Sequence, residues 1–230
     1  MLHLNNISKS FYQRGVVLNE LSLEVNEGDS VSVSGPSGSG KTTLLNIIGL
    51  LDKPDSGEVV FRGVSLLNYN SEQSAIYRNR NIGFVFQDHL LLPYLTLKEN
   101  ILLPILASRI SDSEYRKKVD DSLKMMDIIG ISSFSDKYPY QVSGGEAQRA
   151  TLVRALVNKP SVLLADEPTG SLDKENADNL GDLLLLMNRE YGTTLILATH
   201  SIDLARKMQI QLNLSDGKLI PTKSTGKQQK

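Results

Sequence analysis

Residues Gly35-Pro36-Ser37-Gly38-Ser39-Gly40-Lys41-Thr42-Thr43 stand where one sequence pattern gives way to another. Before this loop, residues 30–34 alternate serine with β-branched valine, which predicts a strand. After it, residues 44–48 are apolar at helical spacing. The order of strand, glycine-rich loop and helix predicts an α/β fold organised around this loop.

Each residue type in the loop suits phosphate. Gly35, Gly38 and Gly40 allow backbone angles and close approaches that a Cβ atom would block, so successive N–H groups converge on one anion. The helix that begins at Lys41 adds the positive end of its dipole. The Lys41 ammonium suits β and γ phosphates, and the Thr42 hydroxyl suits Mg²⁺. The loop therefore predicts a site for nucleotide phosphates.

Composition excludes several classes of protein. The 230 residues suffice for one large domain, or for a domain with a lobe. Lys plus Arg number 25 and Asp plus Glu 26, so no basic excess indicates nucleic acid as a partner. Cysteine is absent, which excludes disulfides and cysteine-ligated metals and agrees with a reducing compartment.

Membrane-directed segments are not expected. Residues 1–6 lack the basic and apolar regions of a signal peptide. No apolar run approaches the length of about 18 residues that would span a bilayer. We therefore expect a cytosolic chain, for which any membrane role requires a separate membrane subunit.

Two aromatic residues lie near the N-terminus. Residues 2–8 and 16–25 alternate apolar and polar, which predicts two strands joined by a turn at residues 13–15. Phe11 and Tyr12 precede this turn, where a ring would suit stacking on adenine. Ordinary strand packing is the alternative role.

Gln87 ends an apolar strand predicted at residues 82–86. Its amide would suit Mg²⁺, water or a partner, with a plain surface amide as the alternative. Residues 88–142 are helix-prone and predict an inserted lobe. Within it, Leu90-Leu91-Leu92-Pro93-Tyr94-Leu95 is more apolar than a solvated loop, so we interpret it as a docking surface, with lobe core as the alternative.

A second glycine-containing motif is Ser143-Gly144-Gly145-Glu146, followed by helical spacing through Val157. Ser143 is a natural N-cap, and the two glycines leave N–H groups open at a helix start. The motif predicts a second anion-binding position, unless it is only a capped helix.

Two acidic residues, Asp166 and Glu167, follow the apolar strand predicted at residues 162–165. Carboxylates there are costly unless a cation pairs with them or chemistry uses them. We assign Asp166 to Mg²⁺ and Glu167 to the base that polarises attacking water, with a capping pair as the alternative. His200 follows the strand predicted at residues 193–198 and would hydrogen-bond the γ-phosphate.

These motifs, with Ser171-Leu172-Asp173 before His200, stand in the order found in ATP-binding-cassette (ABC) ATPases, which the chain resembles over nearly its whole length. One departure from the family's pattern is Val142, which stands where these ATPases usually have a leucine before the serine that matches Ser143. The resemblance implies a P-loop NTPase with a mixed-sheet core, an antiparallel β subdomain and an inserted α-helical subdomain. The implied boundaries are one domain over 1–221, with core and β subdomain in 1–87 and 159–221, a helical lobe in 88–158, and a disordered tail in 222–230.

The resemblance also implies that two copies pair head to tail around ATP and Mg²⁺. Ser143, Gly144 and Gly145 would then reach the γ-phosphate held by the opposite copy. The implied nucleotide contacts are Phe11, Gly35, Pro36, Ser37, Gly38, Ser39, Gly40, Lys41, Thr42, Thr43, Gln87, Ser143, Gly144, Gly145, Glu146 and Asp173. Those assigned to hydrolysis are Lys41, Gln87, Glu167 and His200, and those assigned to the metal are Thr42, Gln87 and Asp166.

Residues 49–57, 166–173 and 198–200 are similar to a subfamily of lipoprotein-releasing, macrolide-exporting and division-associated cassettes, and residues 204–219 favour the first. We therefore expect an ATPase peripheral to the cytoplasmic face of the inner membrane, docked to a membrane subunit near Gln87 and residues 90–95. Export of small molecules or peptides and division signalling are alternatives. A remote alternative is a mechanical ATPase acting on DNA or ribosomes, but such proteins usually carry a long coiled coil or two cassettes. A nucleotide sensor that does not hydrolyse ATP is a third alternative, against which Lys41, Asp166, Glu167 and His200 argue.

Overall fold

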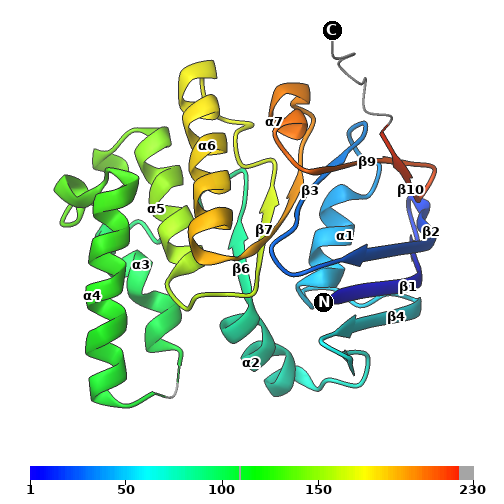
Figure 1. The fold of residues 1–230 in the computed structure, drawn as a ribbon, viewed down its shortest axis with the longest axis horizontal. Coiled ribbons are helices and arrows are strands. Elements are labelled where there is room, and N and C mark those ends of the chain that lie inside the picture. The colour runs from blue at the N-terminus through cyan, green and yellow to red at the C-terminus, as the bar shows by residue number, and fades with distance from the viewer. Residues whose placement is uncertain (109, 223–230) are drawn as a thin grey trace, which may run out of the picture. The chain divides into compact units, whose positions relative to one another are not determined.

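The computed structural model describes residues 1–108 and 110–222 (Figure 1). The chain divides into two compact units, one formed by Met1–Asn68 with residues 196–222 and the other by Tyr69–Leu195. The predicted tail at residues 222–230 lies outside the described residues from 223 onward.

An antiparallel sheet in the first unit has the order β2-β1-β4-β5. Its strands are β1 (Leu2–Phe11), β2 (Gly15–Val25), β4 (Ser56–Phe61) and β5 (Val64–Ser65). Leu2 and Leu4 of β1 are buried, as the alternating pattern predicts, and Ile7 is buried after a register shift that follows Leu4. Strand β1 runs past the predicted end at residue 8, because Phe11 pairs with Gly15 and closes the hairpin.

A mixed sheet in the same unit has the order β10-β9-β3-β8. Strand β3 (Ser30–Ser34) is parallel to β9 (Ile210–Ser215), with Val31 opposite Ile210, and β9 is antiparallel to β10 (Lys218–Pro221). These last two strands form one edge of the sheet. Helices α1 (Lys41–Ile48) and α7 (Ile202–Arg206) belong to this unit, and β8 (Thr194–Ala198) enters it from the second.

The second unit carries the order β8-β7-β6. Strand β6 (Ile82–Val85) is parallel to β7 (Val162–Asp166), with Ile82 opposite Val162. Both strands read as short apolar runs because their side chains are largely buried.

Helices make up most of the second unit. They are α2 (Ser71–Asn81), α3 (Leu97–Leu106), α4 (Asp112–Ile129), α5 (Gly144–Leu156) and α6 (Lys174–Tyr191), with the 3-10 turns η1 (Ser132–Phe134) and η2 (Pro139–Gln141). The described residues between 88 and 158 contain no strand, as the helix-prone composition predicts. Helix α2 has no counterpart among the expected elements, because it buries only Ser74 and Tyr77 and so lacks an apolar stripe.

Candidate functional site

The predicted phosphate loop connects β3 to α1 in the first unit. Gly40 caps α1 in the left-handed region, with φ of 108°, and makes no side-chain capping bond. The first turn of α1 contains no acidic residue. The N–H groups at this helix start therefore face no carboxylate of the loop or the first turn, which suits an anion.

Two glycines of the loop are required by their surroundings as well as by their backbone angles. A Cβ atom on Gly35, whose φ is 149°, would lie 2.6 Å from the backbone oxygen of Leu214. A Cβ atom on Gly40 would lie 2.8 Å from Cγ1 of Val17. Any larger residue at either position would displace the loop from β9 or β2.

The loop also supplies polar groups for a triphosphate. Lys41 is buried, and its ammonium donates to the carbonyl oxygens of Gly35 at 2.8 Å and Pro36 at 3.2 Å. The Ser39 hydroxyl is buried and has no hydrogen-bond partner among the described residues. A buried hydroxyl of this kind is satisfied when a phosphate oxygen reaches it, so the loop fits the predicted ligand. Thr42 and Thr43 lie in the first turn of α1.

Phe11 and Tyr12 differ in their surroundings. The Phe11 ring is 38% exposed, at the end of β1, with the Lys9 ammonium 5.3 Å from its centroid. Tyr12 is fully exposed. Phe11 is therefore the better held of the two rings, which supports its assignment to adenine.

His200 also lies in the first unit, where it follows β8. The Thr199 N–H donates to the Val33 oxygen at 3.1 Å, next to the end of β3. Because Ser34 and Gly35 follow Val33, His200 and the start of the phosphate loop come at the ends of neighbouring strands.

The two predicted acidic residues come at the end of β7 in the second unit. Val85 of β6 lies opposite Ala165 of β7. Gln87 comes two residues after Val85 and Glu167 two residues after Ala165, so both follow the same end of this parallel pair. Glu167 has a positive φ of 46°, which is unusual for a non-glycine residue, and its carbonyl accepts from the Gly170 N–H at 2.9 Å. Such strain is typical of positions that function retains.

Gln87 lies beside the turn that follows Glu167. A Cβ atom on Gly170 would lie 3.2 Å from Cδ of Gln87, and the Ser171 hydroxyl donates to the Gln87 oxygen at 3.4 Å. The structure thus brings Gln87 together with the segment that joins Glu167 to Asp173.

The motif at residues 143–146 begins α5, and Ser143 is its N-cap, as predicted. The Ser143 hydroxyl accepts from the Glu146 N–H at 3.3 Å, while the Glu146 carboxylate accepts from the Ser143 N–H at 2.7 Å. Glu146 therefore orders the helix start that was predicted to meet nucleotide.

This helix start lies against the N-terminus of α6. A Cβ atom on Gly145 would lie 2.8 Å from Oδ1 of Asn176. Asp173 caps α6 by accepting from the Asn176 N–H at 2.9 Å, and this bond, with that from the Asn176 amide, holds the pKa of Asp173 below its usual value. The structure brings the serine-glycine motif and Asp173 together.

Two polar residues that the sequence analysis missed organise this part of the second unit. The Gln148 amide is 2% exposed and donates to the carbonyl oxygens of Phe86 at 2.6 Å and Pro168 at 3.0 Å. The Arg154 guanidinium donates to the oxygens of His89 at 2.9 Å and Leu90 at 2.8 Å. Both lie on α5, so this helix positions the segments after β6 and β7. In the sequence, these two roles could have been inferred only from polar residues that interrupt the apolar positions of this helix.

Asn100 on α3 organises residues 90–95 in the same way. It is fully buried, accepts from the Leu92 N–H at 2.7 Å, and donates to the oxygens of Leu92, Leu95 and Thr96 at 3.0–3.1 Å. Leu90, Leu92 and Tyr94 stay exposed, so an internal polar anchor presents an apolar surface.

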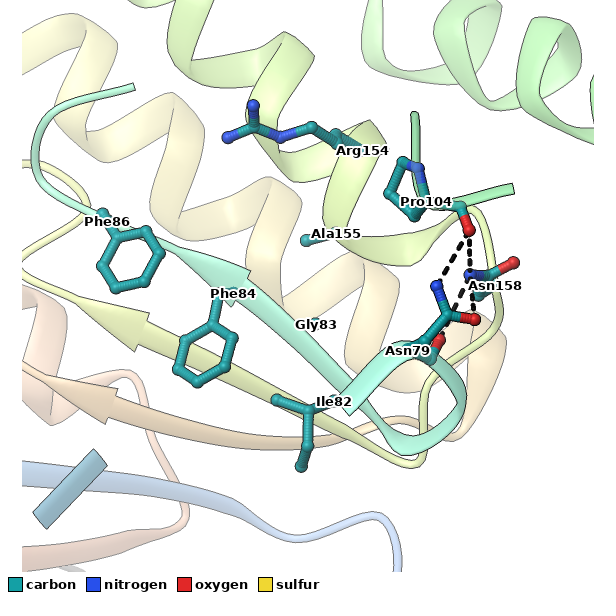
Figure 2. A pocket seen from close by; sticks show the side chains of 9 residues that line it. All are labelled: Asn79, Ile82, Gly83, Phe84, Phe86, Pro104, Arg154, Ala155 and Asn158. Carbon is teal, nitrogen blue, oxygen red and sulfur yellow. Dashed lines mark hydrogen bonds between the residues drawn. The ribbon is translucent and has the colours of Figure 1, made fainter. Parts of the chain in front are cut away.

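A pocket of about 190 Å³ opens beside β6 and α5 (Figure 2). The rings of Phe84 and Phe86 stack at 5.2 Å between centroids and form its apolar side. At the other end, the Asn79 and Asn158 amides both donate to the Pro104 oxygen, at 2.9 Å and 3.1 Å. The pocket therefore offers an apolar floor with a polar end.

No helix within residues 1–108 and 110–222 combines the length and apolar character of a membrane span. The predicted metal ligands are divided between the units, with Thr42 in the first and Gln87 and Asp166 in the second.

Known proteins match the chain closely. The family model described as ABC transporter matches residues 18–170. The lipoprotein-releasing system ATP-binding protein LolD 1 of Rhodopirellula baltica is 44% identical over 223 residues, covering 96% of each chain. The LolD protein of Syntrophus aciditrophicus is 41% identical over 223 residues, covering 96% of this chain and 99% of its own.

Solved structures match over a similar length. The ATP-binding cassette MJ0796, in a dimeric post-hydrolysis state bound to ADP and Pi, has a TM-score of 0.83 and 39% identity, with 95% of this chain and 96% of that one covered. CbiO1 from Clostridium perfringens, part of an ABC transporter complex, has a TM-score of 0.84 and 28% identity, with 95% and 86% covered. The chain therefore belongs to the ABC transporter family, as an ATP-binding subunit that hydrolyses ATP to drive transport.

Proposed function

We propose that this chain is the ATPase of a lipoprotein-releasing transporter, peripheral to the cytoplasmic face of the inner membrane. The observation that carries the proposal is its similarity, at 40–44% identity over at least 95% of its length, to several LolD proteins. The transported molecule would be held by a separate membrane subunit, and the present chain would supply the force.

ATP would bind with its phosphates in the loop of residues 35–43. The Lys41 ammonium would leave its two carbonyl partners for the β and γ phosphates, and the Ser39 hydroxyl would donate to a phosphate oxygen. Mg²⁺, when bound, would neutralise developing phosphate charge. Its proposed ligands Thr42, Gln87 and Asp166 all offer oxygen, which this ion prefers.

Hydrolysis would depend on Glu167 and His200. The Glu167 carboxylate would orient and deprotonate the attacking water, held in place by its left-handed backbone and the turn to Gly170. His200 would donate a hydrogen bond to the γ-phosphate.

Two copies of the chain would enclose two ATP molecules. Ser143, Gly144 and Gly145 present an ordered helix start, whose N–H groups and dipole suit the γ-phosphate of the opposite copy. Asp173 lies beside that start and would contact the opposite copy too. The dimeric structures of MJ0796 support this arrangement. ATP would favour the closed pair, and hydrolysis would release it.

The membrane subunit would dock on the second unit. The pocket beside Phe84 and Phe86 and the exposed surface of residues 90–95 offer apolar area suited to a short amphipathic helix (Figure 2). Gln87 lies directly after Phe86, so movement of the docked helix would reach the nucleotide through it.

Two experiments test the proposal. Glu167→Gln should keep ATP bound and the dimer closed while the hydrolysis rate falls at least a hundredfold, the lower range for a positioned base. Normal hydrolysis by this variant would contradict the assignment of the base. Second, the membrane subunit that co-purifies with the chain should, in proteoliposomes with a lipoprotein, release that lipoprotein only with ATP. Release of small molecules instead would favour export.

A further inference from the structure

Lys9 lies two residues before Phe11 on β1 and is more buried than lysines usually are. Its side chain is 12% exposed, although lysine is mostly exposed in proteins. The ammonium donates to Oδ1 of Asp52 at 2.9 Å and to the Lys53 oxygen at 2.7 Å, and Asp55 lies 3.7 Å away. A lysine held by so many oxygens is fixed in one position.

The same ammonium lies over the Phe11 ring, 5.3 Å from its centroid. At this distance the ring attracts the cation through its electron-rich face. The contact restrains the ring and occupies one face, while the ring stays 38% exposed.

One acidic partner of Lys9, Asp52, is bonded to α1, the helix that begins at the phosphate loop. The N–H groups of Leu51 and Asp52 both donate to the oxygen of Asn46, in the last turn of α1. Asp52 thus has a fixed place relative to the helix. The start of α1 meets phosphate, and its end fixes the acid that holds Lys9.

The neighbouring residue Ser10 strengthens this connection. Asp55 accepts from the Ser10 N–H at 2.7 Å and from its hydroxyl at 2.8 Å, and the Asp55 N–H donates to the Ser8 oxygen at 2.9 Å. The turn after α1 is therefore hydrogen-bonded to the part of β1 that immediately precedes Phe11.

From this arrangement we infer that Lys9 is a positioning residue for the nucleotide base: held by Asp52 and Asp55, it sets the Phe11 ring at a fixed distance from the phosphate loop. The inference rests on the proposed role of Phe11 as the surface on which adenine stacks. It is independent of the transported molecule. The Lys9 ammonium is held by residues that follow the end of α1, whereas the phosphate loop precedes its start, so the effect of Lys9 should be confined to ligands that carry a base.

The test compares equilibrium binding of ATP with that of inorganic tripolyphosphate, both without divalent metal so that no hydrolysis occurs. Lys9→Gln should weaken ATP binding about three- to tenfold, which lies within the range of a cation–π contact, and leave tripolyphosphate binding unchanged. Lys9→Arg keeps the cation and should restore most of the ATP affinity.

Arg62→Gln is the matched control. Arg62 also pairs with an acid, Glu27, and lies 5.4 Å from the ring centroid of Phe61, in the same unit. Phe61 is only 7% exposed, so its ring is closed to a base. This variant should bind both ligands as the wild type does.

A double-mutant cycle separates positioning from general stabilisation. If Lys9 acts through the ring, Lys9→Gln should have no further effect on ATP binding once Phe11→Ala is present. Additive effects, or equal weakening of ATP and tripolyphosphate by Lys9→Gln, would overturn the inference. A wild-type protein that binds ATP no more tightly than tripolyphosphate would instead refute the assignment of Phe11 itself.

Discussion

Replacing Gln148 by leucine tests whether one buried amide holds two segments of the candidate site. Leucine is similar in size but apolar, so it removes the amide donor that the Phe86 and Pro168 oxygens share at 2.6 Å and 3.0 Å. The two carbonyl oxygens are 62 and 20 residues away along the chain. No local rearrangement of α5 would supply another donor to both.

The magnitude follows from the burial of each partner. A buried polar group left without its hydrogen bond costs about 1–3 kcal/mol. The bond to Pro168 is fully buried and that to Phe86 partly buried. We therefore expect Gln148→Leu to lower the free energy of unfolding by about 2–4 kcal/mol, the sum of one full and one partial cost.

The control is Thr151→Val on the same helix. Thr151 is as buried as Gln148, but its hydroxyl donates only to the Gln148 backbone oxygen, within α5. Its loss should cost about 1 kcal/mol, the typical net value of one hydrogen bond. Urea denaturation of the full chain, followed by circular dichroism, gives both free energies with comparable slopes.

Activity provides the second measurement. Phe86 precedes Gln87, and Pro168 follows Glu167, so Gln148→Leu should lower the ATP hydrolysis rate well below that of Thr151→Val at a temperature where both are folded. Equal stability loss in the two variants would refute the hydrogen-bond argument. A stability loss of the expected size with unchanged hydrolysis would refute the claim that this amide positions the site.

Three further outcomes are expected. Gly83→Ala places a Cβ atom 2.4 Å from the Ala155 oxygen, so β6 or α5 must shift, and urea denaturation should show a loss of about 1–3 kcal/mol. Asp173→Asn removes a carboxylate whose pKa is lowered by bonds from Asn176. A lowered pKa stabilises the fold above the unfolded-state value near 3.8 and ceases to do so as the pH falls through the folded value. Denaturation curves of wild type and variant should therefore differ at neutral pH and converge in acid, and curves that stay parallel would contradict this. Asn100→Leu removes the anchor of residues 90–95, so limited proteolysis should cut there sooner and the membrane subunit should no longer stimulate hydrolysis.

The sequence alone determined the elements whose cause is local. Alternation and β-branched residues predicted β3, the glycine loop predicted the start of α1, and Ser143 predicted the cap of α5, because each depends on residues a few positions apart. The short apolar run ending in Asp166 and Glu167 predicted β7 and its acidic end for the same reason. Membership of the ABC transporter family followed from the order of these motifs.

Only the tertiary structure decided which distant groups meet. Lys9 reaches Asp52 across 43 positions, and Gln148 reaches Phe86 across 62. Such pairs depend on strand register and helix packing, which no local pattern specifies. Helix α2 escaped prediction because it buries few apolar residues, and the strained backbone of Glu167 is imposed by the turn to Gly170. The motifs thus predicted the chemistry of the site, while long-range packing determined how its residues are held.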